Sequence, residues 1–202
     1  NVASGRATRG LRPFGSPQID LARADDYLAA MAQHGVVVDV NERRESVRTQ
    51  AAALAASVAG RIPEDTALLD EVTNLVEHPT ALVGSFEPQY LALPQEVLVT
   101  VMKKHQRYFP VVDADSGDLM PYFMAVRNGD DQHLDVVREG NEDVLRARFA
   151  DAKFFFENDT AQPLEGCLPR LDTLTFQEQL GSMLDKSTRL ETLALAVCRA
   201  FG

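Results

Sequence analysis

The residues best suited to chemistry lie in the segment MKKHQRYF, where basic side chains run directly into aromatic ones. The candidate ligand-binding residues of this segment are Lys103, Lys104, His105 and Arg107. Cations of this kind bind phosphate groups and aromatic rings stack on bases, so the pattern is typical of a nucleic-acid contact. A structural interpretation is also open: the basic residues end a helix, where the helix dipole favours cations, and Tyr108 and Phe109 begin a core strand.

A second set of cations lies on the stretch GNEDVLRARFADAKFFFEND, residues 140–159. Its apolar residues recur at helical spacing, which predicts a long amphipathic helix with Asn141 as N-cap. The three consecutive phenylalanines, residues 154–156, step around the last turn and predict that this end is enclosed. The remaining faces carry Arg146, Arg148 and Lys153, which are either anion contacts or salt-bridge residues.

Catalytic and metal-binding patterns are missing from the sequence. It has no glycine-rich phosphate loop, no HExxH and no GxSxG, and its four histidines stand singly. Cys167 and Cys198 are far apart and form no CxxC pair, so we expect two small buried thiols rather than a disulfide or zinc site. The sequence thus predicts no catalytic residues, no metal site and no cofactor of its own.

Composition is that of an ordinary globular domain, with 45% hydrophobic and 25% charged residues among 202. The net charge of −10 argues against a surface that attracts polyanions everywhere, so nucleic-acid binding requires a local basic patch. No apolar run is long enough to span a bilayer, and no signal peptide is recognisable. We therefore expect a cytosolic protein without membrane contact.

The order of elements predicts the α+β class: a small antiparallel sheet packed with several long helices. The clearest strands are 108–112 and 119–126, joined by the turn-forming segment DADSGD. Four further helices are expected: 20–33, one that starts at an Asn41 cap and ends at Gly60, 66–77 and 179–200. Val36 to Val38 form a short strand candidate. The apolar side of the last helix has no obvious cover in the chain, so we expect it to belong to a following domain.

Several segments, in order, resemble the β subunit of the bacterial tetrameric glycyl-tRNA synthetase. They are TRGLRPF, EVTNLVEHPTALVGSF, LPQEVLVTVMKKHQRYFPV, DADSGDLMPYFMAVRN, GNEDVLRARFADAKFFFEND and FQEQLGSMLDK. The resemblance covers nearly the whole chain and marks it as an internal fragment of that subunit. The sequence departs from the family pattern at three positions. Leu11 stands where a histidine is usual, and Pro13 is inserted before Phe14. His78 stands where a tryptophan is common.

The resemblance implies a division of labour. In this family the α subunit binds ATP, Mg and glycine, and the β subunit of the α2β2 tetramer is needed to bind glycine tRNA and to complete aminoacylation. Residues 1–172 are then an α+β module like the B3/B4 module of phenylalanyl-tRNA synthetase, with an N-terminal arm, and 173–202 begin a helical HD-like domain. The implied role is tRNA binding and assembly in the cytoplasm, in support of glycine attachment by a glycine-tRNA ligase.

Two other functions remain open from the sequence. One is an editing hydrolase that acts on mischarged tRNA, as the likeness to the phenylalanine enzyme suggests, although the sequence supplies no positioned base. The other is a purely structural module that joins the α subunit to distal β domains.

Overall fold

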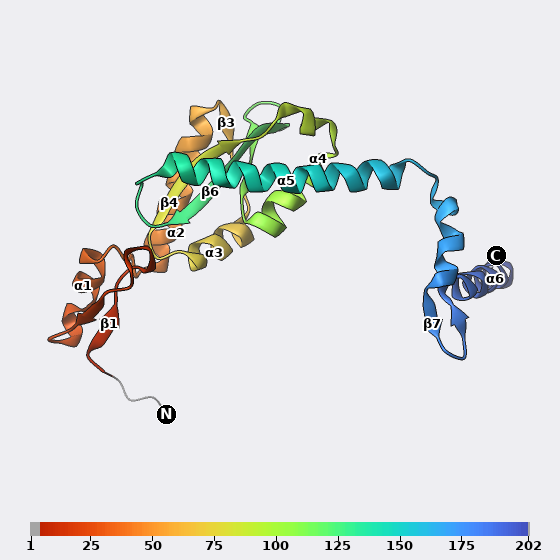
Figure 1. Cartoon of the computed structure of the whole chain (residues 1–202), viewed down its shortest axis with the longest axis horizontal. Helices are drawn as coiled ribbons and strands as arrows, with labels where there is room; N and C mark the ends of the chain where they lie inside the picture. The colour runs from red at the N-terminus through yellow and green to blue at the C-terminus, as the bar shows by residue number, and fades with distance from the viewer. Residues whose placement is uncertain (1–4, 202) are drawn as a thin grey trace. The chain divides into compact units, whose positions relative to one another are not determined.

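The computed structural model describes residues 5–201, which form two compact units (Figure 1). The first unit ends at Lys153 and the second begins at Phe154, inside the long helix α5 (Leu134–Thr160). The domain boundary expected from the family resemblance, between residues 172 and 173, stays a prediction. The mixture of helices and antiparallel sheets confirms the α+β class.

A four-stranded antiparallel sheet forms the centre of the first unit, in the order β3-β5-β6-β4. Its strands are β3 (Gly60–Arg61), β4 (Pro79–Ser85), β5 (Phe109–Asp113) and β6 (Leu119–Asn128). The predicted hairpin is confirmed as β5 and β6, and the Asp113 carboxylate accepts from the backbone N–H groups of Asp115 and Ser116 in its turn.

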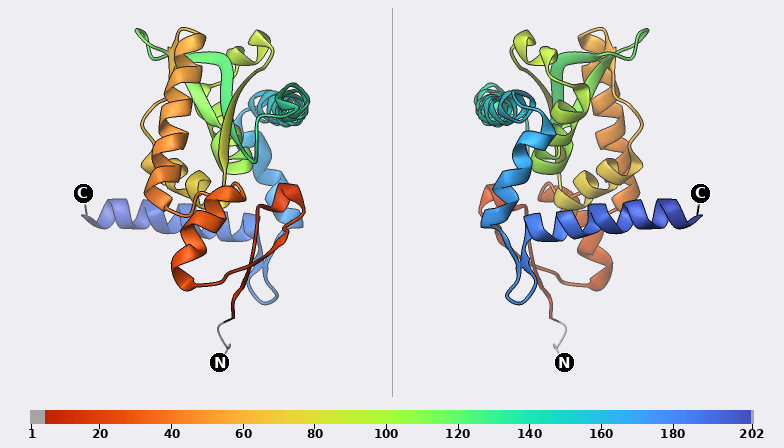
Figure 2. Two further views of the ribbon diagram at one scale, coloured as in Figure 1. Left: turned by 90° about the vertical axis from the view of Figure 1, so that its left-hand side faces the viewer. Right: turned by 90° about the vertical axis from the view of Figure 1, so that its right-hand side faces the viewer.

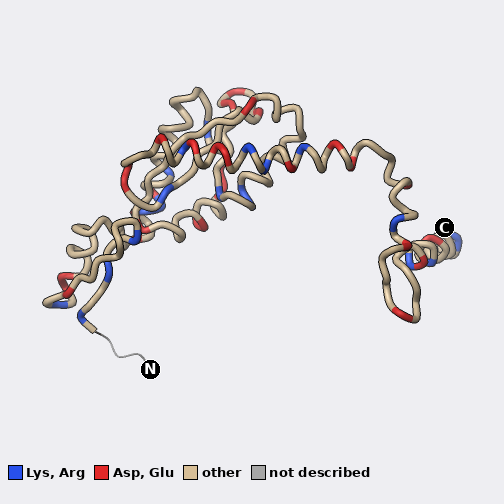
Figure 3. Tube along the Cα trace, viewed as in Figure 1, with Lys and Arg blue, Asp and Glu red and all other residues tan. Residues whose placement is uncertain are grey.

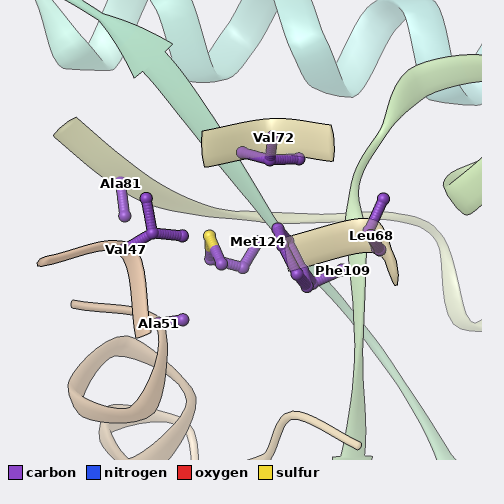
Figure 4. Packing of buried hydrophobic residues seen from close by; sticks show 7 residues of the cluster. All are labelled: Val47, Ala51, Leu68, Val72, Ala81, Phe109 and Met124. Atoms are coloured by element: carbon purple, nitrogen blue, oxygen red, sulfur yellow. The ribbon is translucent and has the colours of Figure 1, made fainter. Parts of the chain in front are cut away.

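Two helices cover one face of this sheet, α2 (Val40–Ser57) and α3 (Thr66–Leu75). The hydrophobic core between them and the sheet consists of Val47, Ala51, Leu68, Val72, Ala81, Phe109 and Met124 (Figure 4). Each helix is capped by an aspartate whose carboxylate accepts a hydrogen bond from a backbone N–H group of the first turn: Asp39 caps α2 and Asp65 caps α3. Asp39, not Asn41, is therefore the cap of α2.

Helix α5 lies on the opposite face of the sheet from α2 (Figure 2). Phe123 and Met124 are neighbours in β6, so their side chains point to opposite faces. Met124 joins the core under α2, whereas Phe123 stacks on Tyr108 at 4.7 Å between ring centroids. The Tyr108 hydroxyl donates to Asn141 Oδ1 of α5 at 2.9 Å, which ties this helix to the sheet.

Short elements connect these layers. The chain runs through η3 (Pro88–Ala92), α4 (Gln95–Thr100) and a π-helical turn, η4 (Val101–Gln106), before it enters β5. At the N-terminal end, β1 (Ala7–Arg9) pairs antiparallel with β2 (Gln18–Asp20), with η1 (Arg12–Phe14) between them. They are followed by η2 (Ala24–Asp26) and α1 (Tyr27–Gln33), so the helix expected over 20–33 is observed only from residue 27. His34, not Gly35, is the C-cap of α1, and Gly35 follows it with φ of +74°.

The second unit contains η5 (Leu164–Thr173), the two-stranded β7 (Thr175–Gln177) and β8 (Gly181–Ser182), and α6 (Met183–Phe201). Helix α6 begins four residues later than the expected start at 179, because a hairpin precedes it. Ser182 and Asp185 exchange side-chain to backbone hydrogen bonds at its start, as in a capping box. The large apolar residues Leu190, Leu193 and Val197 of α6 are all exposed.

Three further local predictions are wrong. Residues 134–160 form one continuous helix, so Asn141 is not an N-cap but an interior residue whose side chain bonds Tyr108. The enclosed phenylalanine end is not observed either, because Phe154 and Phe155 are each 62% exposed. Residues 36–38 form no strand: the Val37 N–H donates to Glu77 O, and no ladder continues from that bond in the described chain.

The cysteines also differ from expectation. Cys167 is half-buried and Cys198 is exposed, so neither is a buried thiol. Cys198 lies on α6, whose residues are mostly exposed, because few residues between 5 and 201 pack on that helix. Residue type alone does not predict this, since free cysteine is usually buried in a core.

Candidate nucleic-acid interface

The basic segment at residues 103–107 lies where η4 meets β5. Val101 and Met102 are buried and fix the turn on the core, and the Tyr108 N–H donates to Met102 O at 2.9 Å. Arg107 closes the turn in the left-handed region, with φ of 57°. The four predicted side chains are thus brought together at one helix-to-strand corner.

Two of these four side chains, Lys103 and Arg107, are paired with carboxylates of the α3 segment. Lys103 forms an ion pair with Asp65, and Arg107 Nε donates to Glu71 Oε1 at 2.9 Å. Burial alone would raise the pKa of Asp65, but the Lys103 ammonium and the Leu68 N–H outweigh it and hold that pKa below its usual value. These contacts dock η4 on α3, so Lys103 and Arg107 have a structural role.

Lys104 and His105 differ from their neighbours. Both side chains are exposed, and neither forms an ion pair with any carboxylate among residues 5–201. A cation without a nearby acid keeps its full attraction for an external anion. Lys104 is therefore the most available cation of this corner.

The aromatic part of the pattern is structural. Tyr108 and Phe109 are both buried, and burial raises the pKa of the Tyr108 phenol above its usual value. Their rings contact Phe123 and the core under α2, so they are not accessible to stack on bases. Of the two interpretations that the sequence left open, the core-strand interpretation is right for these residues.

The cations of α5 also include one that is paired with carboxylates and one that has no acidic partner among residues 5–201. Arg146 binds Glu87 Oε1 through Nε at 2.6 Å and Asp143 Oδ1 through Nη1 at 2.5 Å, and its hydrogen bond lowers the pKa of Glu87. Arg148 is exposed and forms no ion pair within the described part of the chain. Lys153 is exposed at the end of the first unit. Arg148 is thus the more available of the two arginines.

The remaining histidines do not gather into a site. His34 and His78 each have Nδ1 at 2.8 Å from a backbone oxygen, that of Ala30 and of Gly35 respectively. No cluster of three or more potential metal ligands occurs among residues 5–201. None of the helices in that range has the length and apolarity needed to cross a membrane.

The sequence did not identify the acids that pair with Lys103 and Arg107, nor a group of exposed arginines at the N-terminal hairpin. The acids are distant in sequence, Glu71 being 36 residues from Arg107. The arginines left a visible signal, because Arg6, Arg9 and Arg12 fall within seven residues of an acidic chain.

The structure is an α+β module with a few exposed cations, such as Lys104 and Arg148, that have no acidic partner among residues 5–201. Cations of this kind contact phosphate groups in other proteins. The sequence model of the family described as "Glycyl-tRNA synthetase beta subunit" matches residues 1–201. This chain belongs to that family.

Individual relatives agree with this assignment. The chain is 47% identical over 201 residues to the "Glycine--tRNA ligase beta subunit" of Desulfitobacterium hafniense (strain Y51), and 44% identical to that of Clostridioides difficile (strain 630). Each match covers 100% of this chain and 29% of the relative. The subunit of the same name from Bacillus subtilis (strain 168) is 44% identical over 194 residues, 96% of this chain and 28% of the relative.

Proposed function

We propose that this chain is a tRNA-binding and assembly part of a glycyl-tRNA synthetase β subunit. In this proposal the α subunit uses ATP and Mg to attach glycine to its tRNA, and the β subunit holds that tRNA within an α2β2 tetramer in the cytoplasm. The assembly part is supported by the relatives' name, since a beta subunit implies an α-subunit partner. The exposed rings of Phe154 and Phe155 are apolar surface suited to such a contact.

The observation that carries the tRNA part is the exposure of Lys104 without an acidic partner. The chain as a whole is acidic, so a polyanion is attracted only where cations are locally uncompensated. Arg148 meets the same condition on α5, whereas Lys103, Arg107 and Arg146 are held by carboxylates. We expect Lys104, with His105 beside it, and Arg148 to contribute more to tRNA affinity than those three.

We predict that Lys104→Ala combined with Arg148→Ala, in the full β subunit together with the α subunit, weakens tRNA binding and flattens its salt dependence. Removal of one phosphate-binding cation lowers the slope of log affinity against log salt by about 0.7 to 0.9, because fewer counterions are released on binding. Filter binding of labelled glycine tRNA over a range of salt concentrations measures both quantities.

The matched control is Arg44→Ala combined with Arg48→Ala. It removes the same formal charge, but these two guanidinium groups are paired with Asp70 and Glu45. The control is expected to keep a slope near that of the unaltered protein. Equal slopes for the unaltered protein and the Lys104 and Arg148 variant would show that these residues do not contact tRNA.

A further inference from the structure

We propose that the N-terminal hairpin forms a second contact for tRNA phosphates, through Arg6, Arg9 and Arg12. The hairpin consists of β1, η1 and β2, and it is distinct from the corner that holds Lys104. This inference rests on the proposed function and deepens it, because it names a second surface of the chain for the same partner.

The hairpin is locally basic in an acidic chain. Residues 5–22 contain three arginines and one aspartate, Asp20, so their formal net charge is +2, whereas that of the whole chain is −10. Figure 3 shows blue positions along the strand that Figure 1 labels β1, and red positions close to it toward α1. The formal charge of this segment is therefore opposite in sign to that of the whole chain.

The three arginines are exposed, and none forms an ion pair with a carboxylate in the part of the chain that the structure describes. Asp20 accepts a hydrogen bond from Gln18 Nε2 at 3.1 Å. The next arginine, Arg23, is different because it pairs with Asp25 at 3.1 Å. The charge of the hairpin is thus directed to solvent rather than neutralised by internal pairs.

The hairpin is also packed against the rest of the first unit. Leu11 is fully buried beside Gly35, and Pro13 lies next to Gly129, at the end of β6. The Gly10 N–H donates to Pro17 O at 2.9 Å, and Ser16 N–H donates to Leu11 O at 3.2 Å. A surface fixed in this way loses little conformational freedom on binding.

Arg9 has a further restraint. Its Nη1 donates to Ser16 O at 3.2 Å across the hairpin, which orients the guanidinium and leaves its other N–H groups for a ligand. Planar guanidinium groups bind phosphate oxygens through paired hydrogen bonds. Guanidinium groups presented by such a hairpin suit RNA backbone phosphates.

The test is a triple variant, Arg6→Gln, Arg9→Gln and Arg12→Gln, in the full β subunit with the α subunit. Glycine tRNA is the probe, in filter binding across salt concentrations. We expect weaker binding and a salt slope reduced by about 2 to 3, because three phosphate-binding groups are removed. The control triple, Arg23→Gln, Arg44→Gln and Arg48→Gln, removes the same charge from paired arginines and is expected to leave the slope unchanged.

A second variant guards against a folding defect. Arg6→Gln with Arg12→Gln keeps the Arg9 bond to Ser16, and its expected slope reduction is about 1.4 to 1.8. Equal reductions for the test and control triples would overturn the inference, because net charge alone would then be the cause. Weaker α-subunit association with unaltered tRNA affinity would also overturn it, since the hairpin would then face an acidic protein surface.

The same experiment separates this inference from the proposed function. If the unaltered protein binds tRNA and the Lys104 and Arg148 variant weakens that binding, an unaffected hairpin triple refutes the hairpin contact alone. If the β subunit adds no tRNA affinity to the α subunit, the proposed function fails and the hairpin contact fails with it.

Discussion

Replacement of Phe149 by alanine is expected to destabilise the first unit by about 3 to 5 kcal/mol. The Phe149 side chain is 0% exposed and lies at the centre of an aromatic cluster between α5 and η3. Its ring contacts Phe86 edge to face at 4.9 Å and Tyr90 at 5.5 Å between centroids. Alanine leaves a cavity there and removes the packing that joins the helix to the sheet layer. Urea unfolding of the chain, followed by circular dichroism, measures the free energy of unfolding.

The matched control is Phe155→Ala on the same helix. This ring is 62% exposed, so its removal is expected to change the free energy of unfolding by no more than about 0.5 kcal/mol. Similar destabilisation by Phe149→Ala and Phe155→Ala would contradict the arrangement in which only the first ring is part of the core.

The second large effect is expected at Gly84, which is paired with Phe123 across β4 and β6. A Cβ atom on Gly84 would overlap Cζ of Phe123, whose ring is fully buried against Tyr108. The ring cannot move without disturbing that stack. Gly84→Ala is therefore expected to cost about 1 to 3 kcal/mol through overpacking, measured by the same urea unfolding.

At Gly140, in contrast to Gly84, replacement by alanine is expected to stabilise the protein. It lies in the interior of α5 with no atom within 4 Å of an added Cβ, so alanine meets no obstacle there. Gly140→Ala is expected to stabilise the protein by about 0.5 to 1 kcal/mol, because alanine is the better helix former. Destabilisation by Gly140→Ala would argue for a helix that begins at this residue, as the sequence suggested.

Sequence patterns within a short segment predicted the elements that depend on that segment alone. The β5 and β6 hairpin was predictable from two apolar runs around a turn rich in aspartate, serine and glycine. The continuity of α5 was not, because Gly140 and Asn141 have the composition of a helix start. Only the tertiary bond from Tyr108 to Asn141 shows why an asparagine is used in the helix interior.

The candidate site was predictable to a similar extent. The basic residues at 103–107 do lie together on the surface, as their spacing indicated. Which of them are available to a ligand depends on Asp65 and Glu71, whose positions follow from the packing of α3 beside η4. Residue spacing carries no information on such partners. For the same reason the arginines of the hairpin are distinguished from paired arginines only by their surroundings in the fold.

The central claim is that this chain contacts tRNA through cations without acidic partners, and amine labelling of Lys104 tests it most directly. The measurement is the rate of lysine acetylation in the complex of full β and α subunits, with and without saturating glycine tRNA, determined by mass spectrometry of the peptides. Lys186, which lies 4.0 Å from the ring centre of Phe176 in the second unit, is the internal reference. We predict that tRNA slows the labelling of Lys104 more than that of Lys186. Equal labelling rates of Lys104 with and without bound tRNA would contradict the claim.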